Sequence, residues 1–363
     1  MATQDSLFDE PEAPEPPEDA QAEGTDTKPA KPLRPAKTPR PAKVTQVQPL
    51  APNPAHRALI DDLPPQLRLG TSSWYFPGWA GLVWEGDYEQ SVLSKHGLPA
   101  YVQHPLFRTV SIDRTFYRPL TASQFAAYAA QVPDDFRFVV KAPSLVADAM
   151  VRGDDGRGMQ PNPAFLDPQL AIEQFVQPAL DGLGHKIGAL VFQLSPLPSP
   201  RFARMSQVLD QLRTMLTALP SLAPAAPDGV IAVEVRNPEF LTSAFTDVLR
   251  ETGATYCLGL HPKLPPIKEQ LPLLRALWPG PLVCRWSLNR LHGAYGYEEA
   301  RELYLPFDKI VDPDPDTHAA LARVIVGTTG AGHPAYVTIS NKAEGSAPLT
   351  VLKLAEEVRR QRN

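Results

Sequence analysis

Residues 230–236 read Val-Ile-Ala-Val-Glu-Val-Arg, and this stretch shows the pattern on which the fold depends. Ile231, Val233 and Val235 alternate with the residues between them, and a period of two is typical of a β-strand. Glu234 and Arg236 share the opposite face. The stretch therefore predicts a strand that packs one face against apolar elements and carries charge on the other.

Runs of β-branched or apolar residues of this kind recur along the chain, each followed by a helical pattern. The predicted strands are Arg68–Ser72, Arg108–Asp113, Phe136–Ala142, Gly188–Leu194, Val230–Arg236, Ala254–Leu260, Leu282–Leu288 and Ala335–Ser340. The predicted helices cover residues 89–103, 122–131, 168–182, 201–219, 239–252, 267–277, 297–306 with 316–327, and 347–360. Eight such units in about 290 residues predict an α/β fold, a single (β/α)8 TIM-type barrel. The alternative, a doubly wound open sheet, needs a glycine-rich phosphate turn after an early strand, and none is evident.

Composition limits the class of the protein. Of 363 residues, 43% are apolar and 21% are charged, which is enough to build a core, and the net charge of −5 argues against a basic nucleic-acid coat. No apolar run approaches the roughly 18–20 residues that span a bilayer, and the acidic N-terminus lacks a signal-peptide pattern. Cys257 and Cys284, the two cysteines, exclude a disulfide framework and are interpreted as core residues. We expect a cytoplasmic protein that does not contact a membrane.

Proline marks a domain boundary. The chain has 42 prolines, and 14 of them lie in residues 1–66, which contain few large apolar side chains. Such a segment cannot bury enough surface to offset its chain entropy. We therefore predict a disordered, proline-rich tail over residues 1–66 and a barrel domain over residues 67–363.

The predicted tail has two blocks of opposite charge. Residues 1–27 carry nine acids and no Lys or Arg, whereas residues 28–43 carry six bases and no acid. The bases recur at every third position, which places them on one edge of a polyproline II helix: Lys28, Lys31, Arg34, Lys37, Arg40 and Lys43. Such an edge suits a nucleic-acid backbone, and the alternative is a solvated spacer that pairs with its acidic neighbour.

A short motif lies ahead of the acidic residues. Gln4-Asp5-Ser6-Leu7-Phe8 resembles the pentapeptide by which bacterial DNA-transaction proteins dock on the replication sliding clamp, except that Asp5 replaces the usual Leu. Leu7 and Phe8 would fill an apolar pocket, and Gln4 would hydrogen-bond at its rim. The tail therefore predicts nucleic acid or a sliding clamp as a partner. The alternative is that these five residues are a disordered N-terminus without a binding function.

Polar side chains gather where the predicted strands end. In a parallel barrel these C-terminal ends meet at one mouth, which is where barrel enzymes have their sites. The residues concerned are Asp113, Lys141, Gln193, Glu234, Arg236, His261, Arg285 and Asn341. A buried charge is costly unless it is paired or binds a ligand. The clustering of these polar side chains therefore predicts a pocket for a small-molecule ligand.

Side-chain chemistry predicts the roles. Asp113, Glu234 and Lys141 are the candidate catalytic residues, with the two carboxylates as acid and base. Arg236 and Arg285, together with Lys141, would bind an anion such as phosphate or carboxylate. Three further ligand-binding candidates are Gln193, Asn341 and His261, the last of which could also shuttle a proton.

Two alternatives to this pocket stay open. The charges could fill the barrel as structural ion pairs, Glu234 with Arg236 and Asp113 with Lys141. A divalent metal could instead be held by Asp113, Glu234 and His261, although the sequence contains no HxH or HExxH motif. The cofactor is therefore left unassigned.

Two predicted loops are rich in aromatic residues. Residues 73–79, after the first strand, read Ser-Trp-Tyr-Phe-Pro-Gly-Trp, and Phe116 and Tyr117 follow the second strand. Trp74 and Tyr117 are candidates to stack against a sugar or a base, and the alternative is a hydrophobic plug over the barrel. Residues 144–167 predict a flexible loop, a candidate lid.

Several separated motifs resemble the YecE-like family, domain of unknown function 72, over residues 67–358. They are Gly70-Thr71-Ser72-Ser73-Trp74-Tyr75, Thr115-Phe116-Tyr117-Arg118, Phe136-Arg137-Phe138 with Lys141-Ala142, Gln193-Leu194, Glu234-Val235-Arg236, and Tyr336-Val337 with Asn341. The resemblance implies a TIM-type barrel but no defined activity. This chain departs from the family pattern at Ser111 and Asp113, where the family usually has Glu and Asn.

We therefore expect an enzyme, a hydrolase or an isomerase, that performs acid/base chemistry on an anionic, sugar-like or nucleotide-like small molecule. The alternative is a DNA-associated accessory protein that is tethered by its tail and has little or no catalysis. A barrel scaffold that binds a protein partner is a third reading.

Overall fold

The computed structural model describes residues 46–152 and 158–362, which contain a closed barrel of eight parallel strands. The barrel strands are β1 (Leu67–Thr71), β2 (Thr109–Ile112), β3 (Arg137–Lys141), β6 (Ile187–Gln193), β7 (Val230–Glu234), β8 (Thr255–Leu260), β9 (Leu282–Trp286) and β10 (Ala335–Ile339). They pair in chain order, and β1 closes the barrel by pairing with β10, where Leu67 lies opposite Ala335. The predicted (β/α)8 barrel is confirmed.

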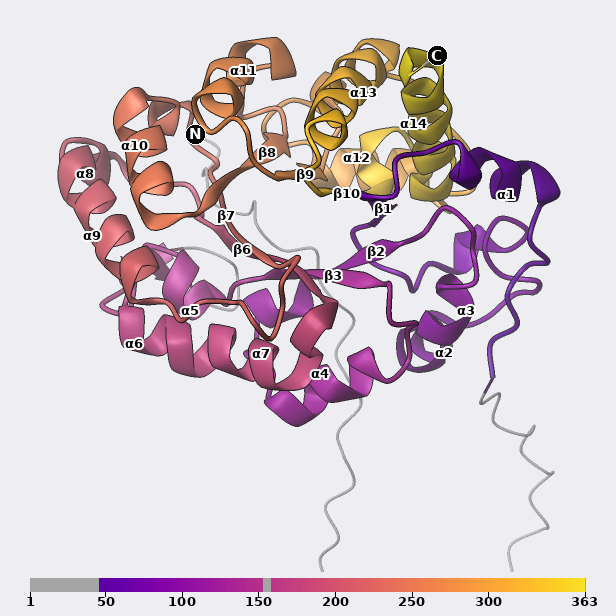
Figure 1. Cartoon of the computed structure of the whole chain (residues 1–363), viewed down its shortest axis with the longest axis horizontal. Coiled ribbons are helices and arrows are strands. Elements are labelled where there is room, and N and C mark those ends of the chain that lie inside the picture. The colour runs from indigo at the N-terminus through magenta and orange to yellow at the C-terminus, as the bar shows by residue number, and fades with distance from the viewer. Residues whose placement is uncertain (1–45, 153–157, 363) are drawn as a thin grey trace, which may run out of the picture.

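Helices surround the strands (Figure 1). They are α2 (Gln90–His96), α3 (Leu98–Tyr101), α4 (Ala122–Ala129), α6 (Pro168–Ala171), α7 (Gln177–Leu183), α8 (Ser199–Phe202), α9 (Met205–Ala218), α10 (Ser243–Thr252), α11 (Ile267–Ala276), α12 (Tyr297–Tyr304), α13 (Pro315–Gly330) and α14 (Ala347–Arg362). Local signals fix several ends. Thr121 begins α4 with a capping box, and Gly253 ends α10 with a φ of +70° that glycine adopts without strain. None of the described helices combines the length and apolarity that a membrane-spanning helix requires.

The alternation seen in the sequence separates two apolar layers. Val233 and Val235 belong to the large apolar cluster between strands and helices. Ala232, which precedes Val233 in β7, faces the opposite way and belongs to the cluster in the barrel interior. The interior cluster fills the barrel with Val139, Ala189, Val191, Ala232, Cys257, Val283 and Tyr336. Cys257 and Cys284 are both buried, as predicted. On β3 this apolar layer, represented by Val139, lies between Arg137 at the start of the strand and Lys141 at its end, and Lys141 is at the mouth.

The folded domain begins before residue 67, and the prediction of a disordered tail is wrong for residues 46–66. This stretch contains α1 (Pro54–Asp61), and Val47, Leu59 and Leu63 are buried against the barrel. Asn53 caps α1 by accepting a hydrogen bond from Ala55 N at 2.9 Å. Proline content describes the average of a segment, so it hides a short capped helix with a few apolar contacts. Residues 1–45, with the clamp-like motif and the six bases, lie outside the described residues.

The predicted loop over residues 144–167 also contains regular structure. It includes α5 (Ser144–Ala147) and an antiparallel pair of strands, β4 (Met150–Arg152) and β5 (Gly158–Pro161), which lie outside the barrel. Asn162 anchors the base of the pair, since its Nδ2 donates to the carbonyl oxygens of Leu145 and Asp148 at 2.8 and 2.7 Å. Residues 153–157, between β4 and β5, lie outside the described residues.

Candidate active site

A cavity of about 150 Å³ opens at the C-terminal ends of the barrel strands. Eight of the ten residues predicted for the site line it: Trp74, Asp113, Tyr117, Lys141, Gln193, Arg236, His261 and Arg285. They come from seven different strand ends, which only a closed parallel barrel brings together.

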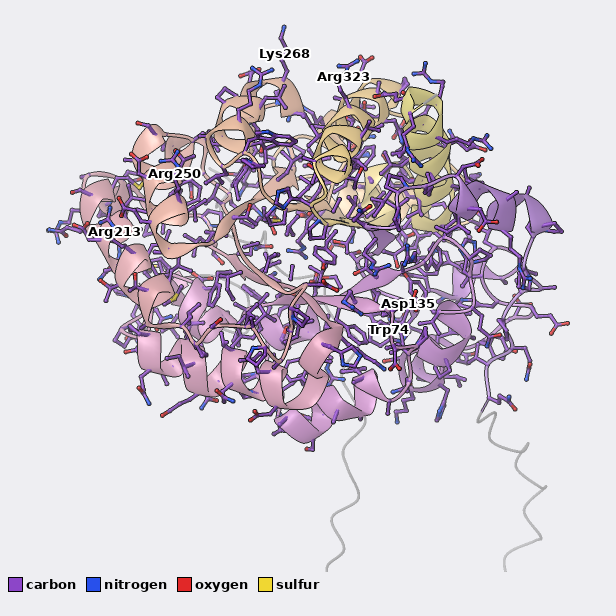
Figure 2. All side chains as sticks on the ribbon, viewed as in Figure 1. Trp74, Asp135, Arg213, Arg250, Lys268 and Arg323 are labelled. Carbon is purple, nitrogen blue, oxygen red and sulfur yellow. The ribbon has the colours of Figure 1, made fainter. Side chains whose placement is uncertain are left out.

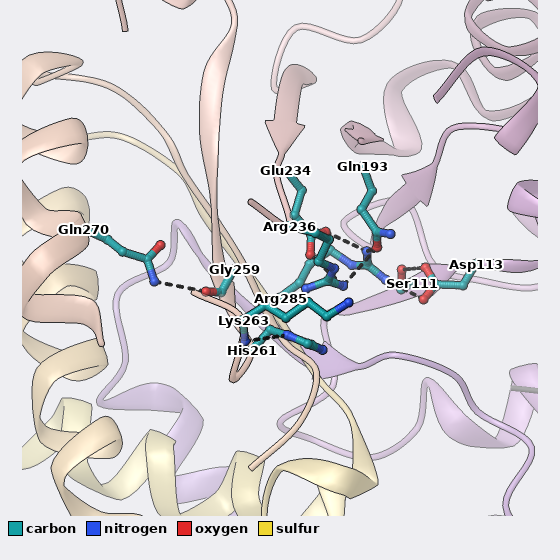
Figure 3. A network of polar contacts seen from close by, with 10 residues as sticks. All are labelled: Ser111, Asp113, Gln193, Glu234, Arg236, Gly259, His261, Lys263, Gln270 and Arg285. Atoms are coloured by element: carbon teal, nitrogen blue, oxygen red, sulfur yellow. Dashed lines mark hydrogen bonds and ion pairs between the residues drawn. The ribbon is translucent and has the colours of Figure 1, made fainter. Parts of the chain in front are cut away.

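Arg285 lies at the centre of the polar network (Figure 3). Its Nη1 donates to Glu234 Oε2 at 2.7 Å and to Gln193 Oε1 at 3.0 Å, and its Nη2 donates to Asp113 Oδ2. Burial opposes the charge, but the carboxylates of Asp113 and Glu234 raise the pKa of Arg285 above its ordinary value. Arg285 is therefore a fixed cation whose donors are largely used by the protein itself.

Arg236 carries the second buried guanidinium, and one of its nitrogens has no hydrogen-bond partner in the described part of the chain. Its Nη2 lies 2.9 Å from Glu234 Oε1 and donates to Gln193 Oε1 at 3.0 Å. Its Nη1 is buried and has no hydrogen-bond partner within the described part of the chain. The predicted Glu234–Arg236 ion pair is thus present, but it satisfies only one side of the guanidinium.

Three other residues that line the cavity also carry a buried polar atom without a hydrogen-bond partner among the described residues. They are Ser73 (Oγ), Trp74 (Nε1) and Thr338 (Oγ1). A buried polar group left unsatisfied costs about 1–3 kcal/mol, so folded proteins rarely keep several together unless a ligand or water satisfies them. The cavity therefore has the polarity of a binding site.

Asp113 is the more accessible of the two carboxylates. Ser111 Oγ donates to its Oδ1 at 2.5 Å, Arg285 binds its Oδ2, and its side chain is 34% exposed. The predicted filler pair of Asp113 with Lys141 does not form, because Arg285 takes that place. Ser111 and Asp113, the positions that depart from the family pattern, are therefore hydrogen-bonded to each other and built into the network.

Lys141 lies beside the network without joining it. Its Nζ is 3.6 Å from the centre of the Phe116 ring, and no carboxylate of the described residues lies within 4 Å of it. Burial lowers the pKa of Lys141 to about 8, with Asp113 opposing the shift and Arg285 and Arg236 adding to it. An amine with a pKa near neutrality can accept or release a proton under physiological conditions.

His261 lines the cavity as a neutral donor. Lys263 N–H donates to its Nδ1 at 3.0 Å, so the proton of the neutral ring resides on Nε2. Burial, with Arg236, Lys263 and Arg290, lowers the pKa of His261 to about 2. A ring that stays neutral favours hydrogen bonding to a ligand over the proton shuttle suggested by the sequence.

The aromatic loops contain some side chains that line the cavity and others that are buried away from it. Trp74 and Tyr75 line the cavity, and Tyr117 reaches it from the loop after β2. Trp79 and Trp84 are fully buried in the apolar cluster between strands and helices, and their rings stack at 6.3 Å between ring centres. Only part of each aromatic loop therefore faces the cavity.

One wall of the cavity consists of residues that the sequence did not predict. Tyr295, Tyr297 and Glu298 line it from the loop after β9 and the start of α12, and the Tyr297 ring lies 5.4 Å from that of His261. The pair Tyr295-Gly296-Tyr297 was a usable signal, since it follows a barrel strand just as Trp74 and Tyr117 do.

Two of the predicted site residues are not brought to the cavity. Glu234 is 0% exposed and lies beneath the lining, with both oxygens on arginines. Asn341 is buried elsewhere, where its Oδ1 accepts from Trp79 Nε1 at 3.1 Å and from Ala347 N at 2.9 Å. Neither side chain is among the residues that line the cavity.

The metal alternative is not supported by the geometry. Among residues 46–152 and 158–362, no group of three or more His, Cys, Asp or Glu side chains is arranged to hold a metal ion. Glu234 contacts two arginines, and Arg236 also lies close enough to His261 to lower its pKa. Asp113, Glu234 and His261 therefore face cations that would compete with a metal.

Eight parallel strands with a polar cavity at their C-terminal ends define the molecule as a TIM-type barrel protein with a candidate active site. The family model described as "Protein of unknown function DUF72" matches residues 68–363. The chain belongs to the DUF72 family, as its motifs indicated.

Solved structures agree with this assignment. A DUF72 family protein from Thermotoga maritima is 17% identical, with a TM-score of 0.51 over 82% of this chain and 99% of that one. A DUF72 family protein from Enterococcus faecalis is 16% identical, with a TM-score of 0.51 over 80% of this chain and 95% of that one. At these identities the similarity shows the fold alone. A search of curated proteins found no match.

Proposed function

We propose that the barrel is an enzyme that binds a small anionic molecule at its mouth and transfers a proton to or from it. The observation that carries this proposal is Arg236 Nη1, a buried cationic donor that has no protein partner in the described chain and belongs to a residue lining the cavity. A carboxylate or phosphate oxygen is the group that best satisfies such a donor.

The charge balance supports an anionic ligand. In the network, three cations (Lys141, Arg236 and Arg285) face two carboxylates (Asp113 and Glu234), and His261 is neutral. The positive charge in excess belongs to Lys141, which has no carboxylate within 4 Å in the described chain. An anion bound beside Lys141 and Arg236 would compensate that charge.

We assign proton transfer to Lys141, with Asp113 as the accessible carboxylate. The pKa of Lys141 is about 8, so the amine can act as acid or base near neutral pH, as a hydrolase or an isomerase requires. Glu234, the other predicted acid/base residue, is better understood as a positioning residue, because it is fully buried and holds both arginines.

The dimensions limit the ligand. The cavity of about 150 Å³ is smaller than the roughly 300–1,000 Å³ of pockets that hold drug-sized ligands. It suits a small acid, a sugar phosphate, or the phosphate end of a nucleotide, with Trp74 and Tyr117 available to stack on a ring.

Binding of matched ligands tests the proposal. The full chain is mixed with glucose 6-phosphate or adenosine monophosphate, and in parallel with glucose or adenosine, and its melting temperature is measured. We expect stabilisation by the phosphorylated member of at least one pair, and its loss in Arg236→Gln but not in the exposed control Arg57→Gln. Equal shifts with the neutral molecule, or an unchanged shift in Arg236→Gln, would refute anion recognition at this site.

A second function is proposed for the tail from its sequence. Six bases at every third position suit the phosphates of a nucleic acid, and Gln4, Leu7 and Phe8 suit a sliding clamp. In that case the barrel is carried to DNA by its tail. Pull-down of the clamp with the full chain and with a Leu7→Ala, Phe8→Ala variant tests this, and equal recovery would argue against the motif.

A further inference from the structure

A second cavity, distant from the candidate active site, is a groove of about 430 Å³ between α11 and α13. Its walls are mainly apolar and include Leu271, Leu274, Leu277, Ala320 and Val324. Thr255 and Leu282, the first residues of β8 and β9, also line it. The groove therefore lies toward the N-terminal ends of the strands, at the opposite end of the barrel from the mouth.

The groove has a cationic rim. Lys268, Arg275 and Arg323 line it and are exposed, and no carboxylate of the described residues lies within 4 Å of their charged nitrogens. Figure 2 shows Lys268 and Arg323 extending from neighbouring helices at the same edge of the molecule. Trp278, at the groove, is 52% exposed. An occupant that matches this surface has apolar side chains between negative charges.

We propose that this groove binds the acidic N-terminal segment of the same chain, residues 1–27, with Leu7 and Phe8 in the apolar part. The segment carries nine acids and no Lys or Arg, and Asp5, Asp9 and Glu10 flank its one pair of large apolar side chains. These charges match the three rim cations. The basic block, residues 28–43, has the same sign as the rim and would be repelled from it.

The length of the tail permits this contact. The described chain begins at residue 46, so 38 positions separate Phe8 from it, and at about 3.1 Å per residue an extended segment of that length reaches roughly 115 Å. A globular domain of this size has a radius of gyration of only about 20 Å. The tail can therefore reach the groove around the outside of the barrel.

Docking would have a consequence for the tail as a partner-binding segment. Leu7 and Phe8, once packed between α11 and α13, are unavailable to another protein. The basic block would stay outside the groove because it is repelled, and it would remain accessible to a polyanion. The contact would therefore control reversibly whether the acidic half of the tail can bind a partner. It is independent of the chemistry proposed for the barrel mouth.

Disulfide trapping in the full chain tests the proposal. One variant carries Ser6→Cys and Ala320→Cys, which places a thiol beside Leu7 and another in the groove. The control carries Ser6→Cys and Ala127→Cys, on α4, which lies on the opposite side of the barrel from α11 and α13 (Figure 1). The native cysteines are buried, so they do not compete for oxidant. The rate of intramolecular disulfide formation is measured at low protein concentration and in increasing salt.

We expect the groove pair to form its disulfide at least tenfold faster than the control pair, and to slow toward the control rate at high salt. Adding Lys268→Glu with Arg323→Glu, or Leu7→Ala with Phe8→Ala, should remove the advantage. Both variants change exposed or tail positions, and unchanged melting temperatures would show that they fold. Equal rates for the two pairs would overturn the proposal. So would a disulfide found only between two chains, because the occupant would then be the tail of a second copy.

Discussion

Arg285 Nη1 lies 2.7 Å from Glu234 Oε2, and this buried contact joins two strands that are not neighbours in the barrel. Glu234 binds Arg236 with its other oxygen at 2.9 Å. One buried carboxylate thus fixes two guanidinium groups beneath the cavity. The role of Glu234 follows from this position: it holds the cations that we propose bind the anion, and it does not meet the ligand.

The first prediction concerns the stability that Glu234 provides. Glu234→Gln removes the negative charge between two buried cations, and breaking a buried ion pair in this way costs about 3–5 kcal/mol. We expect the free energy of unfolding, measured by urea denaturation, to fall by that amount. Glu239→Gln, at an exposed position five residues later, should change it by less than about 0.5 kcal/mol. A loss of less than 1 kcal/mol in Glu234→Gln would mean that the pair contributes little.

The second prediction concerns the pH dependence of anion binding. The pKa of Lys141 is lowered to about 8, so its amine is charged below that pH and neutral above it. The affinity for sulfate, which does not titrate in this range, should be highest below pH 8 and should fall as the pH rises through 8. Because a bound anion favours the charged amine, the midpoint for the complex lies at or above this value.

Calorimetric titrations between pH 6 and pH 10 measure this effect. We expect a loss of about tenfold or more in affinity, since a hydrogen bond to a charged group contributes about 1.5–3 kcal/mol. Lys141→Arg keeps its charge throughout and should remove the pH dependence, whereas Lys95→Arg, on the exposed face of α2, should retain it. A flat profile in the unmodified protein would exclude Lys141 from the anion site.

Local sequence was sufficient for the barrel and for most of the mouth. The alternation of Val233 and Val235 with Glu234 and Arg236 assigned each side chain to a face, and the structure agrees. It could not show that Glu234 lies below the cavity. That depth depends on its contact with Arg285, 51 positions away, and on the register between strands, neither of which leaves a local pattern.

For Asn341 and for residues 46–66, the structure differs from the sequence-based prediction for other reasons. Asn341 follows a barrel strand, as site residues do, but a short 3-10 helix, Asn341–Ala343, turns its side chain toward Trp79 and α14. In residues 46–66, the cap at Asn53 and the proline at the first position of α1 were readable signals. They were outweighed by the proline content of the longer segment that contains them.

The third prediction concerns the protonation of His261. Its Nδ1 accepts a hydrogen bond from Lys263 N–H, and its pKa is lowered to about 2, mainly by burial. We expect the ring to remain neutral, with the proton on Nε2, from pH 8 down to pH 4. Nitrogen NMR of the ring, assigned with His261→Gln, measures this directly. Titration of the ring near pH 6 would show that the cavity is more hydrated than its burial implies.

The fourth prediction concerns the basic block of the tail. If Lys28, Lys31, Arg34, Lys37, Arg40 and Lys43 contact phosphates, the logarithm of the DNA affinity should fall linearly with the logarithm of the salt concentration. Replacing all six with Gln should reduce that slope by up to about five, since each phosphate contact on duplex DNA contributes about 0.9. Binding is measured by fluorescence anisotropy in the full chain. If the slope of affinity against salt is unchanged, the six bases do not contact phosphates, and the basic block is better described as a solvated spacer.

The last prediction separates structural support from ligand binding at Asn341. Asn341→Ala removes the acceptor for Trp79 Nε1 and for Ala347 N, and each buried donor left without a partner costs about 1–3 kcal/mol. We expect a large fall in the free energy of unfolding and, in the protein that remains folded, an unchanged affinity for sulfate. Arg236→Gln should have the opposite effect: sulfate binding should be lost, and the free energy of unfolding should change less than in Asn341→Ala. If Asn341→Ala instead weakened sulfate binding while stability was kept, Asn341 would belong to the cavity after all, and the lining described at the barrel mouth would be incomplete.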